Sequence, residues 1–150
     1  MTDSIHAGDK LLDAWLNLTS TLWNTRLVTS MTFNEAHVLG ILLRHDSEES
    51  PMTATDLIRR TRLLKSQMNK ILTSLEQQGF ISRQRASLDK RMIHIHLTPE
   101  GHAAYLNQHK GVESILASLI ERFGEERALS VAKDLSEITA ILDDIVPLPK

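Results

Sequence analysis

The fold of this chain is decided by residues 65–101, which read KSQMNKILTSLEQQGFISRQRASLDKRMIHIHLTPEG. Within this segment the spacing of the apolar side chains changes from three and four residues to two. The first spacing predicts a helix over 65–78 that Gly79 closes in a left-handed conformation. The second spacing predicts strands on either side of the charged segment 86–91, and therefore a β-hairpin.

Two pairs of polar residues predict helix starts before this segment. Thr32 and Glu35 have the spacing of a capping box, in which each side chain bonds the backbone N–H of the other residue. Thr53 and Asp56 repeat the spacing ahead of a short helix, with aspartate as an imperfect substitute for glutamate. A short helix is therefore expected directly before the helix over 65–78.

Long helices are predicted at both ends of the chain. Residues 9–28 carry two adjacent apolar stripes at helical spacing, and so wide a face needs more than one neighbour. Thr98 caps a helix expected to reach Arg122, where Phe123-Gly124 breaks it. The last helix has a heptad-like seam of Val131, Leu135, Ile138, Leu142 and Ile145. We infer that the terminal helices bury their apolar surface against a second copy of the chain.

Composition limits the class of protein. The chain has 150 residues, of which 41% are hydrophobic, and this is enough for a packed core. The absence of cysteine excludes disulfides, thiolate zinc sites and cysteine nucleophiles. No window is apolar enough for a membrane helix and no secretory signal is found, so a cytoplasmic protein without a membrane partner is expected. No nucleophile elbow, phosphate loop or compact acid–base pair indicates an enzyme.

Charge is distributed unevenly along the chain. The overall net charge is −2, yet residues 57–91 hold nine basic and two acidic side chains, a local net charge of +7. The remainder of the chain therefore carries −9. Such an asymmetry favours a polyanionic partner over an evenly solvated surface.

The outer face of the predicted helix 65–78 contains no acidic residue. At helical spacing this face gathers Ser66, Asn69, Lys70, Thr73 and Gln77. Amides can bond adenine with two hydrogen bonds, hydroxyls donate and accept, and lysine pairs with phosphate or guanine. The face is therefore suited to reading base edges, whereas an ordinary solvated helix more often mixes glutamate with lysine.

The hairpin tip is cationic. Its basic residues are Arg83, Arg85, Lys90 and Arg91. A narrow basic loop can follow a phosphate backbone or enter a minor groove. Asp89 lies two positions before Arg91 and is expected to hold that arginine in a charge-assisted pair.

Two motifs resemble those of MarR-type regulators. Residues 89–101, DKRMIHIHLTPEG, resemble the D-x-R-x5-L-T-x-x-G wing signature of that family. Residues 75–81, LEQQGFI, resemble the exit of its recognition helix, and Ser66 to Lys70 resemble its reading segment. The order of predicted elements agrees over nearly the whole chain.

The resemblance implies a mainly α fold with a small β wing, a winged helix-turn-helix over 32–98 with dimerisation helices at 9–30 and 101–146. It implies a homodimeric regulator, in most cases a repressor, that binds double-stranded DNA at a pseudo-palindromic operator in a bacterial or archaeal cytoplasm. The resemblance further implies that Asp89 of this chain orients the side chain of Arg91. The residues expected to contact DNA are Lys65, Ser66, Gln67, Asn69, Lys70, Thr73, Arg83, Arg85, Lys90 and Arg91.

Two features depart from the family pattern. Leu63 and Leu64 stand where members often have a capping residue, which leaves Thr61 as a candidate cap for a shifted helix start. The segment 86–88, Ala-Ser-Leu, replaces the usual acidic-proline pair ahead of Asp89.

A small effector is also expected from the resemblance, although no cofactor is predicted to be required. Candidate residues for a pocket that takes an aromatic or apolar ligand are Trp15, Trp23, Met31, Phe33, His37 and Ile41. The alternative is that these side chains form core or dimer contacts.

Two rival functions remain open at this point. A zinc-responsive regulator of the same fold would use His37, His102 and His109, with Glu35 and Glu113 as further ligands, although no close His-x-x-x-His pair exists. A protein-interaction module would use the terminal helices alone, and the basic segment 57–91 argues against it.

Overall fold

The computed structural model describes the backbone of residues 2–24, 30–45 and 51–146, and the side chains of residues 5–22, 30–45 and 51–146. Its helices and strands, in chain order, are α1 (Thr2–Asn24), α2 (Phe33–His45), β1 (Met52–Thr53), α3 (Ala54–Thr61), α4 (Lys65–Gln77), β2 (Ile81–Arg85), β3 (Ile93–Leu97), α5 (Pro99–Phe123) and α6 (Glu125–Ile145). The mainly α fold class and the predicted order are confirmed, with one added strand, β1. The predicted end of the first helix at residue 28 lies outside the described residues.

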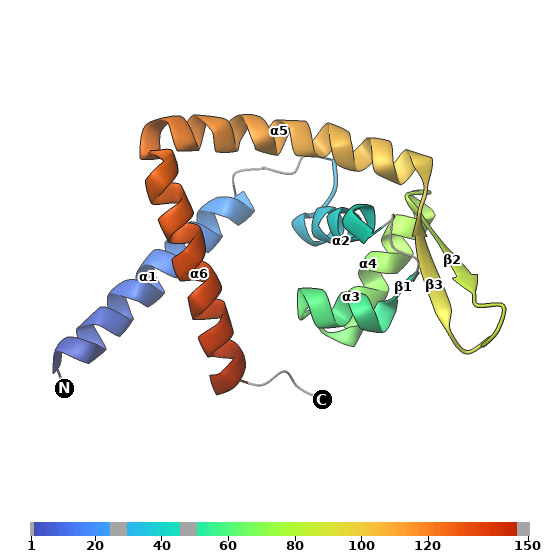
Figure 1. Ribbon diagram of the computed structural model, residues 1–150, viewed down its shortest axis with the longest axis horizontal. Helices are drawn as coiled ribbons and strands as arrows, with labels where there is room; N and C mark the ends of the chain where they lie inside the picture. Colours follow the sequence, from blue (N-terminus) through green and yellow to red (C-terminus); the bar gives the residue numbers. More distant parts are fainter. Residues whose placement is uncertain (1, 25–29, 46–50, 147–150) are drawn as a thin grey trace.

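The helix α5 connects two parts of the molecule (Figure 1). At one of its ends α6 turns away and crosses near α1, and we call α1 and α6 the arm. At its other end lie α2, α3, α4 and the sheet, and we call residues 31–98 the head. No helix among the described residues is both long and apolar enough to span a bilayer.

The sheet has three antiparallel strands in the order β1-β3-β2. The hairpin pairs Ile81 with Leu97 and Arg85 with Ile93, and β1 adds Met52 opposite Ile95. A strand of two residues has no alternating pattern, so the sequence could not reveal β1. Because β1 leads directly into α3, it fixes the start of the helix-turn-helix against the wing.

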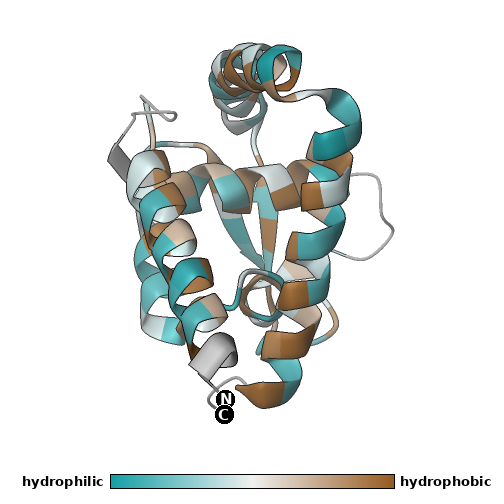
Figure 2. Cartoon of the chain, turned by 90° about the vertical axis from the view of Figure 1, so that its left-hand side faces the viewer, coloured by the Kyte–Doolittle hydropathy of each residue, from teal (hydrophilic) through white to brown (hydrophobic). Residues whose placement is uncertain are grey.

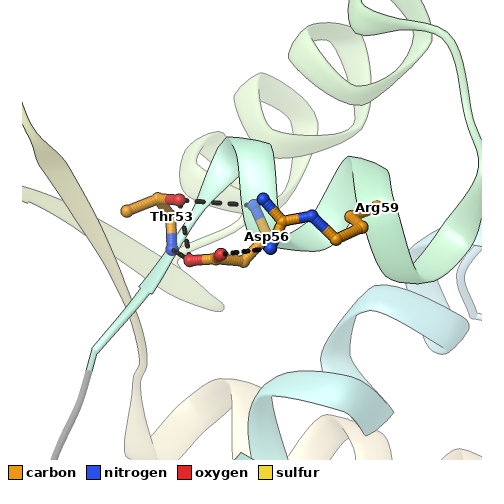
Figure 3. A network of polar contacts seen from close by, with 3 residues as sticks. All are labelled: Thr53, Asp56 and Arg59. Carbon is orange, nitrogen blue, oxygen red and sulfur yellow. Dashed lines mark hydrogen bonds and ion pairs between the residues drawn. The ribbon is translucent and has the colours of Figure 1, made fainter.

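Both predicted capping boxes form. The backbone N of Thr32 donates to Glu35 Oε2 at 2.7 Å and the backbone N of Glu35 donates to Thr32 Oγ1 at 3.2 Å. In the second box, Thr53 N donates to Asp56 Oδ2 at 2.9 Å and Asp56 N donates to Thr53 Oγ1 at 3.3 Å (Figure 3). Aspartate therefore closes this box despite its shorter side chain.

The helix α4 begins without a hydroxyl cap. Leu64 occupies the N-cap position, and its backbone N donates to Gln67 Oε1 at 3.0 Å. Thr61 is the last residue of α3, and its hydroxyl donates to the carbonyl of Leu57 at 2.8 Å. The suggestion that Thr61 caps α4 is therefore wrong. The turn between the helices instead depends on Arg62, which has a left-handed backbone with φ of 60°.

The junction between the wing and α5 explains the L-T-x-x-G motif. Thr98 Oγ1 donates to the carbonyl of Gly79 at 2.6 Å and accepts from the backbone N of Gly101 at 3.0 Å. A Cβ at Gly101 would lie 2.0 Å from the carbonyl oxygen of Phe80. Only glycine fits there, and the contact holds the first turn of α5 against the exit of α4.

The hydrophobic core lies entirely in the head. The buried hydrophobic residues among the described side chains are Met31, Val38, Leu39, Ile41, Leu42, Met52, Leu57, Met68, Leu72, Leu75, Ile81 and Ile95. The arm, by contrast, has no buried residue in α6. On the arm side of the molecule, apolar segments recur along the helices (Figure 2). Ile93 lies beyond the edge of the core and is 44% exposed, although it alternates in phase with buried Ile95.

Candidate nucleic-acid interface

The polar face predicted for α4 is exposed as a unit. Met68, Leu72 and Leu75 are buried on the inner side of the helix. On the outer side, Asn69, Lys70, Thr73 and Gln77 line a shallow hollow of about 330 Å³, together with Ser74. Lys65, Ser66 and Gln67 are exposed on the first turn. These predicted contact residues therefore share one surface.

An ion pair neutralises the single acidic residue of α4. Arg83 donates to Glu76 Oε2 from Nη2 at 2.7 Å and from Nε at 3.0 Å. These hydrogen bonds hold the pKa of Glu76 below its usual range. Arg83 Nη2 also lies 3.4 Å from Thr73 Oγ1. In the chain by itself the guanidinium of Arg83 ties β2 to α4, and its expected contact with DNA stays a prediction.

The wing tip keeps its other cations exposed. Arg85, Lys90 and Arg91 are all exposed at the end of the hairpin. The loop between the strands is closed by backbone hydrogen bonds from Ala86 N to the Met92 carbonyl at 2.9 Å and from Met92 N to the Asp89 carbonyl at 3.0 Å. The tip is therefore preformed in the free chain.

Asp89 shapes this loop in a way that differs from the expected one. Its Oδ1 accepts from the backbone N of Arg91 at 3.0 Å. The ion pairs found among the described side chains do not include one between Asp89 and the Arg91 guanidinium. Asp89 thus bonds the backbone at Arg91 and not its guanidinium.

A buried carboxylate braces α4 from behind. Glu35 is 6% exposed, and its Oε1 accepts from Ser74 Oγ at 2.6 Å and from Gln78 Nε2 at 3.2 Å. Burial raises the pKa of Glu35, but the hydrogen bonds from Ser74, Thr32 and Gln78 outweigh it and bring the pKa below its ordinary value of 4.5. The sequence identified Glu35 only as a capping residue and possible metal ligand. Its link to α4 depends on helix packing, which has no local signal.

An ion pair joins the head to the arm. Arg62, in the turn before α4, forms an ion pair with Asp143 near the end of α6. The two side chains are 40% and 41% exposed, so the pair contributes little to stability. Arg59 likewise lies 3.7 Å from Asp56 at the surface of α3 (Figure 3). Among the described side chains, ion pairs are thus found for Arg59 and Arg62 near α3 but not for Arg85, Lys90 and Arg91 at the wing tip.

The six candidate effector residues do not form one pocket in the chain. Trp15 lines a groove of about 270 Å³ between α1 and α6, whereas Met31 and Ile41 belong to the core of the head. Phe33 and His37 line a separate pocket, and the side chain of Trp23 lies outside the described residues. Their separation follows from helix packing, because α1 faces α6 whereas α2 faces α5 and the core of the head.

The pocket of Phe33 and His37 lies between α2 and α5 and measures about 210 Å³. Its α5 wall includes Tyr105 and His109, whose rings stack with centroids 5.3 Å apart. Gln108, 7% exposed, accepts from Ser30 Oγ at 3.0 Å in the same wall. Desolvation, and then the positive charge of Arg44, lower the pKa of His37. The sequence did not single out Tyr105 or Gln108, because only packing brings α5 to α2.

The histidines do not gather into a metal site among the residues that the structure describes. His109 Nε2 lies 3.3 Å from Glu113 Oε1 one turn along α5. Glu35 is held by Ser74 and Gln78 in the head. The zinc-responsive alternative therefore gains no support from the geometry.

Comparisons with known proteins agree with this geometry. The model of the MarR family matches residues 29–92. The HTH-type transcriptional repressor YetL of Bacillus subtilis is 29% identical over 98 residues, which cover 65% of this chain and 59% of YetL. The chain thus spans less than two thirds of the length of that relative.

Two solved structures share the fold over most of their length. MepR of S. aureus in complex with DNA has a TM-score of 0.69 at 17% identity and covers 88% of this chain and 93% of MepR. PcaV of Streptomyces coelicolor in complex with its natural ligand has a TM-score of 0.69 at 20% identity, covering 87% and 89%. The matching family model over residues 29–92, the wing motif and the shared fold make this chain similar to the MarR family.

Proposed function

We propose that the chain is a sequence-specific DNA-binding transcriptional regulator that represses transcription as a homodimer in a bacterial or archaeal cytoplasm. The observation that carries this proposal is the exposed outer face of α4, free of uncompensated acid, beside the cationic wing tip. YetL is named as a repressor and MepR is seen with DNA, which supports the same role here.

The two reading surfaces have different tasks. Ser66, Gln67, Asn69, Lys70 and Thr73 on α4 would meet base edges in the major groove, with Lys65 on the nearest phosphate. The exposed wing cations Arg85, Lys90 and Arg91 would bind phosphates or enter the minor groove. Arg83 would keep α4 and the wing in register through Glu76.

The dimer would use the terminal helices, residues 9–30 and 101–146. Apolar side chains of α1 and α6 are about half exposed in the single chain, among them Trp15 at 51% and Leu135 at 50%. A second copy is the occupant that would cover them with matching chemistry. Two-fold pairing would place two α4 helices on successive major grooves and so select a pseudo-palindromic operator.

Release from DNA would follow binding of a small ligand in the pocket between α2 and α5. The aromatic lining of Phe33, Tyr105 and His109 suits an aromatic or apolar molecule. PcaV was solved with its natural ligand, which supports a ligand-responsive role. A thermal-shift screen with aromatic acids, repeated on Tyr105→Ala, tests this part. A ligand that stabilises both variants equally would place its site elsewhere.

The salt dependence of DNA affinity tests the proposal as a whole. Binding to random duplex DNA should fall steeply with salt, with a log–log slope of several units, because each phosphate contact releases counterions. Asn69→Ala should relax sequence preference at one base step and cost about 1–3 kcal/mol of binding on the preferred duplex only. A flat salt response of the wild-type chain would contradict the proposal.

A further inference from the structure

The wing carries an apolar side chain at its tip. Leu88 is 101% exposed, more than any other large hydrophobic side chain among the described residues. The exposed leucines of α1 range from 41% to 57%, and Leu11, Leu18 and Leu22 among them line the groove shared with α6. Leu88 therefore makes no contribution to the core of the head or to the surface of the arm.

The setting of Leu88 is a cationic loop closed by hydrogen bonds. Residues 85–91 contain Arg85, Lys90 and Arg91 against a single acid, Asp89. The loop that presents Leu88 is closed by the hydrogen bonds between Ala86 and Met92 and between Met92 and Asp89. Behind the tip the hairpin forms an open hollow of about 550 Å³, which Leu88 lines together with Met92 and His94.

Charge decides which partner suits this tip. A protein surface that buries a leucine offers an apolar patch, and such a patch would have to desolvate three cations as well. The minor groove of DNA instead combines apolar deoxyribose walls with flanking phosphates. Apolar wedges beside basic residues are a known way in which proteins enter that groove.

We infer that Leu88 is an apolar minor-groove contact, packing against deoxyribose and base edges while Lys90 and Arg91 bind the flanking phosphates. The inference rests on the proposed DNA-binding function. Leu88 supplies binding free energy by burial of apolar surface, so its contribution does not involve release of counterions. A salt titration therefore distinguishes the contribution of Leu88 from the ionic contribution of Lys90 and Arg91.

The experiment compares variants of the full chain on a duplex that the wild-type protein selects from a random library. Leu88→Ser should weaken binding roughly tenfold per wing, the effect of losing one buried leucine, with the log–log salt slope unchanged. Lys90→Ala should lower that slope by about one unit. Leu88→Met keeps an apolar side chain of similar size and should restore near wild-type affinity.

A matched control removes exposed apolar surface from the same hairpin. Ile93 is 44% exposed on β3, and Ile93→Thr keeps the β-branched shape that a strand favours. Its affinity should stay within about twofold of wild type, well short of the loss expected at a buried contact. Because the side chain of Leu88 is fully exposed, Leu88→Ser should retain the wild-type circular dichroism spectrum and melting temperature.

The outcomes separate this contact from the function on which it rests. Wild-type affinity for Leu88→Ser, alongside a reduced slope for Lys90→Ala, would overturn the Leu88 contact and leave the DNA-binding function standing. A reduced slope for Leu88→Ser would also overturn it, because the substitution would then act through the cations. Salt-independent or absent binding by the wild-type chain would overturn the function and the contact together.

Discussion

The head and the arm differ in how they treat their apolar side chains: the head buries them within the chain, whereas the arm leaves them largely exposed. Every buried hydrophobic residue among the described side chains lies between Met31 and Ile95, within the head. In the arm, α6 buries none of its residues and α1 leaves leucines and Trp15 about half exposed. Both parts carry apolar stripes at helical spacing, so the stripe alone does not reveal what covers it.

The difference lies in how many elements meet. In the head, three helices and a sheet converge and cover each other within one chain. In the arm, two helices cross at the end of α5, and two helices cannot enclose an apolar face. We therefore expect the head to form its core within a single copy of the chain. The arm, by contrast, is expected to complete its core only when a second copy covers it in a dimer.

The largest expected effect is in the head. Leu57 is fully buried, at 0% exposed, and Leu57→Ala should lower the free energy of unfolding by about 2–5 kcal/mol. The matched truncation Leu129→Ala, at a side chain 65% exposed on α6, should change it by less than about 0.5 kcal/mol in the dilute monomer. Urea titrations of both variants measure the difference. Equal losses would mean that head and arm share one core.

The next effect is in the arm. Leu135 lines the groove between α1 and α6, and Leu135→Lys should weaken the dimer at least roughly tenfold, because a charge would be buried at its interface. Sedimentation equilibrium measures the dissociation constant. Glu137→Lys, an exposed change on the same helix, is the control. A dimer that survives Leu135→Lys intact would place the interface elsewhere.

A smaller effect concerns the brace behind α4. Glu35→Gln keeps a residue that can complete the capping box but removes the charge that Ser74 bonds, and should cost about 1–2 kcal/mol of stability at pH 7. The fold lowers the pKa of Glu35, so this contribution is present above the ordinary value of 4.5 and is lost as pH falls through the folded value.

The gap in stability between wild type and Glu35→Gln should therefore narrow as the pH is lowered below 4.5. Urea titrations at a series of pH values measure it, with Glu137→Gln as an exposed control. A gap that stays constant over this range would show that the charge of Glu35 is unimportant.

The smallest expected effect tests whether Arg83 serves the chain or the DNA. Its pair with Glu76 is partly exposed, at 29% and 41%, and Arg83→Gln should cost less than about 1 kcal/mol of stability. The salt slope of DNA binding should stay unchanged, whereas Arg91→Gln should lower it by about one unit. Equal slopes for the two variants, both reduced, would mean that Arg83 leaves Glu76 for phosphate.

The site was predictable where it depends on local pattern. The outer face of α4 follows from helical spacing alone, and its exposed residues match the predicted set. The partners of Arg83 and Asp89 were not predictable, because a side chain in a cationic segment can turn either to DNA or to a neighbouring acid. The predicted effector set failed to converge for a related reason, since Trp15 and His37 lie on helices that face different partners.

The sequence by itself determined the order of the helices and the hairpin and the starts of α2, α3 and α5, because capping residues and apolar periods act over a few residues. It also determined that two terminal helices carry more apolar surface than the chain can cover. It did not determine the starts of α1 and α4, which begin at Thr2 and Lys65. Only the tertiary structure decided that Glu35 reaches Ser74, that β1 joins the sheet and that Tyr105 closes a pocket with His37. Such contacts join residues about 40 to 70 positions apart, and no local spacing encodes them.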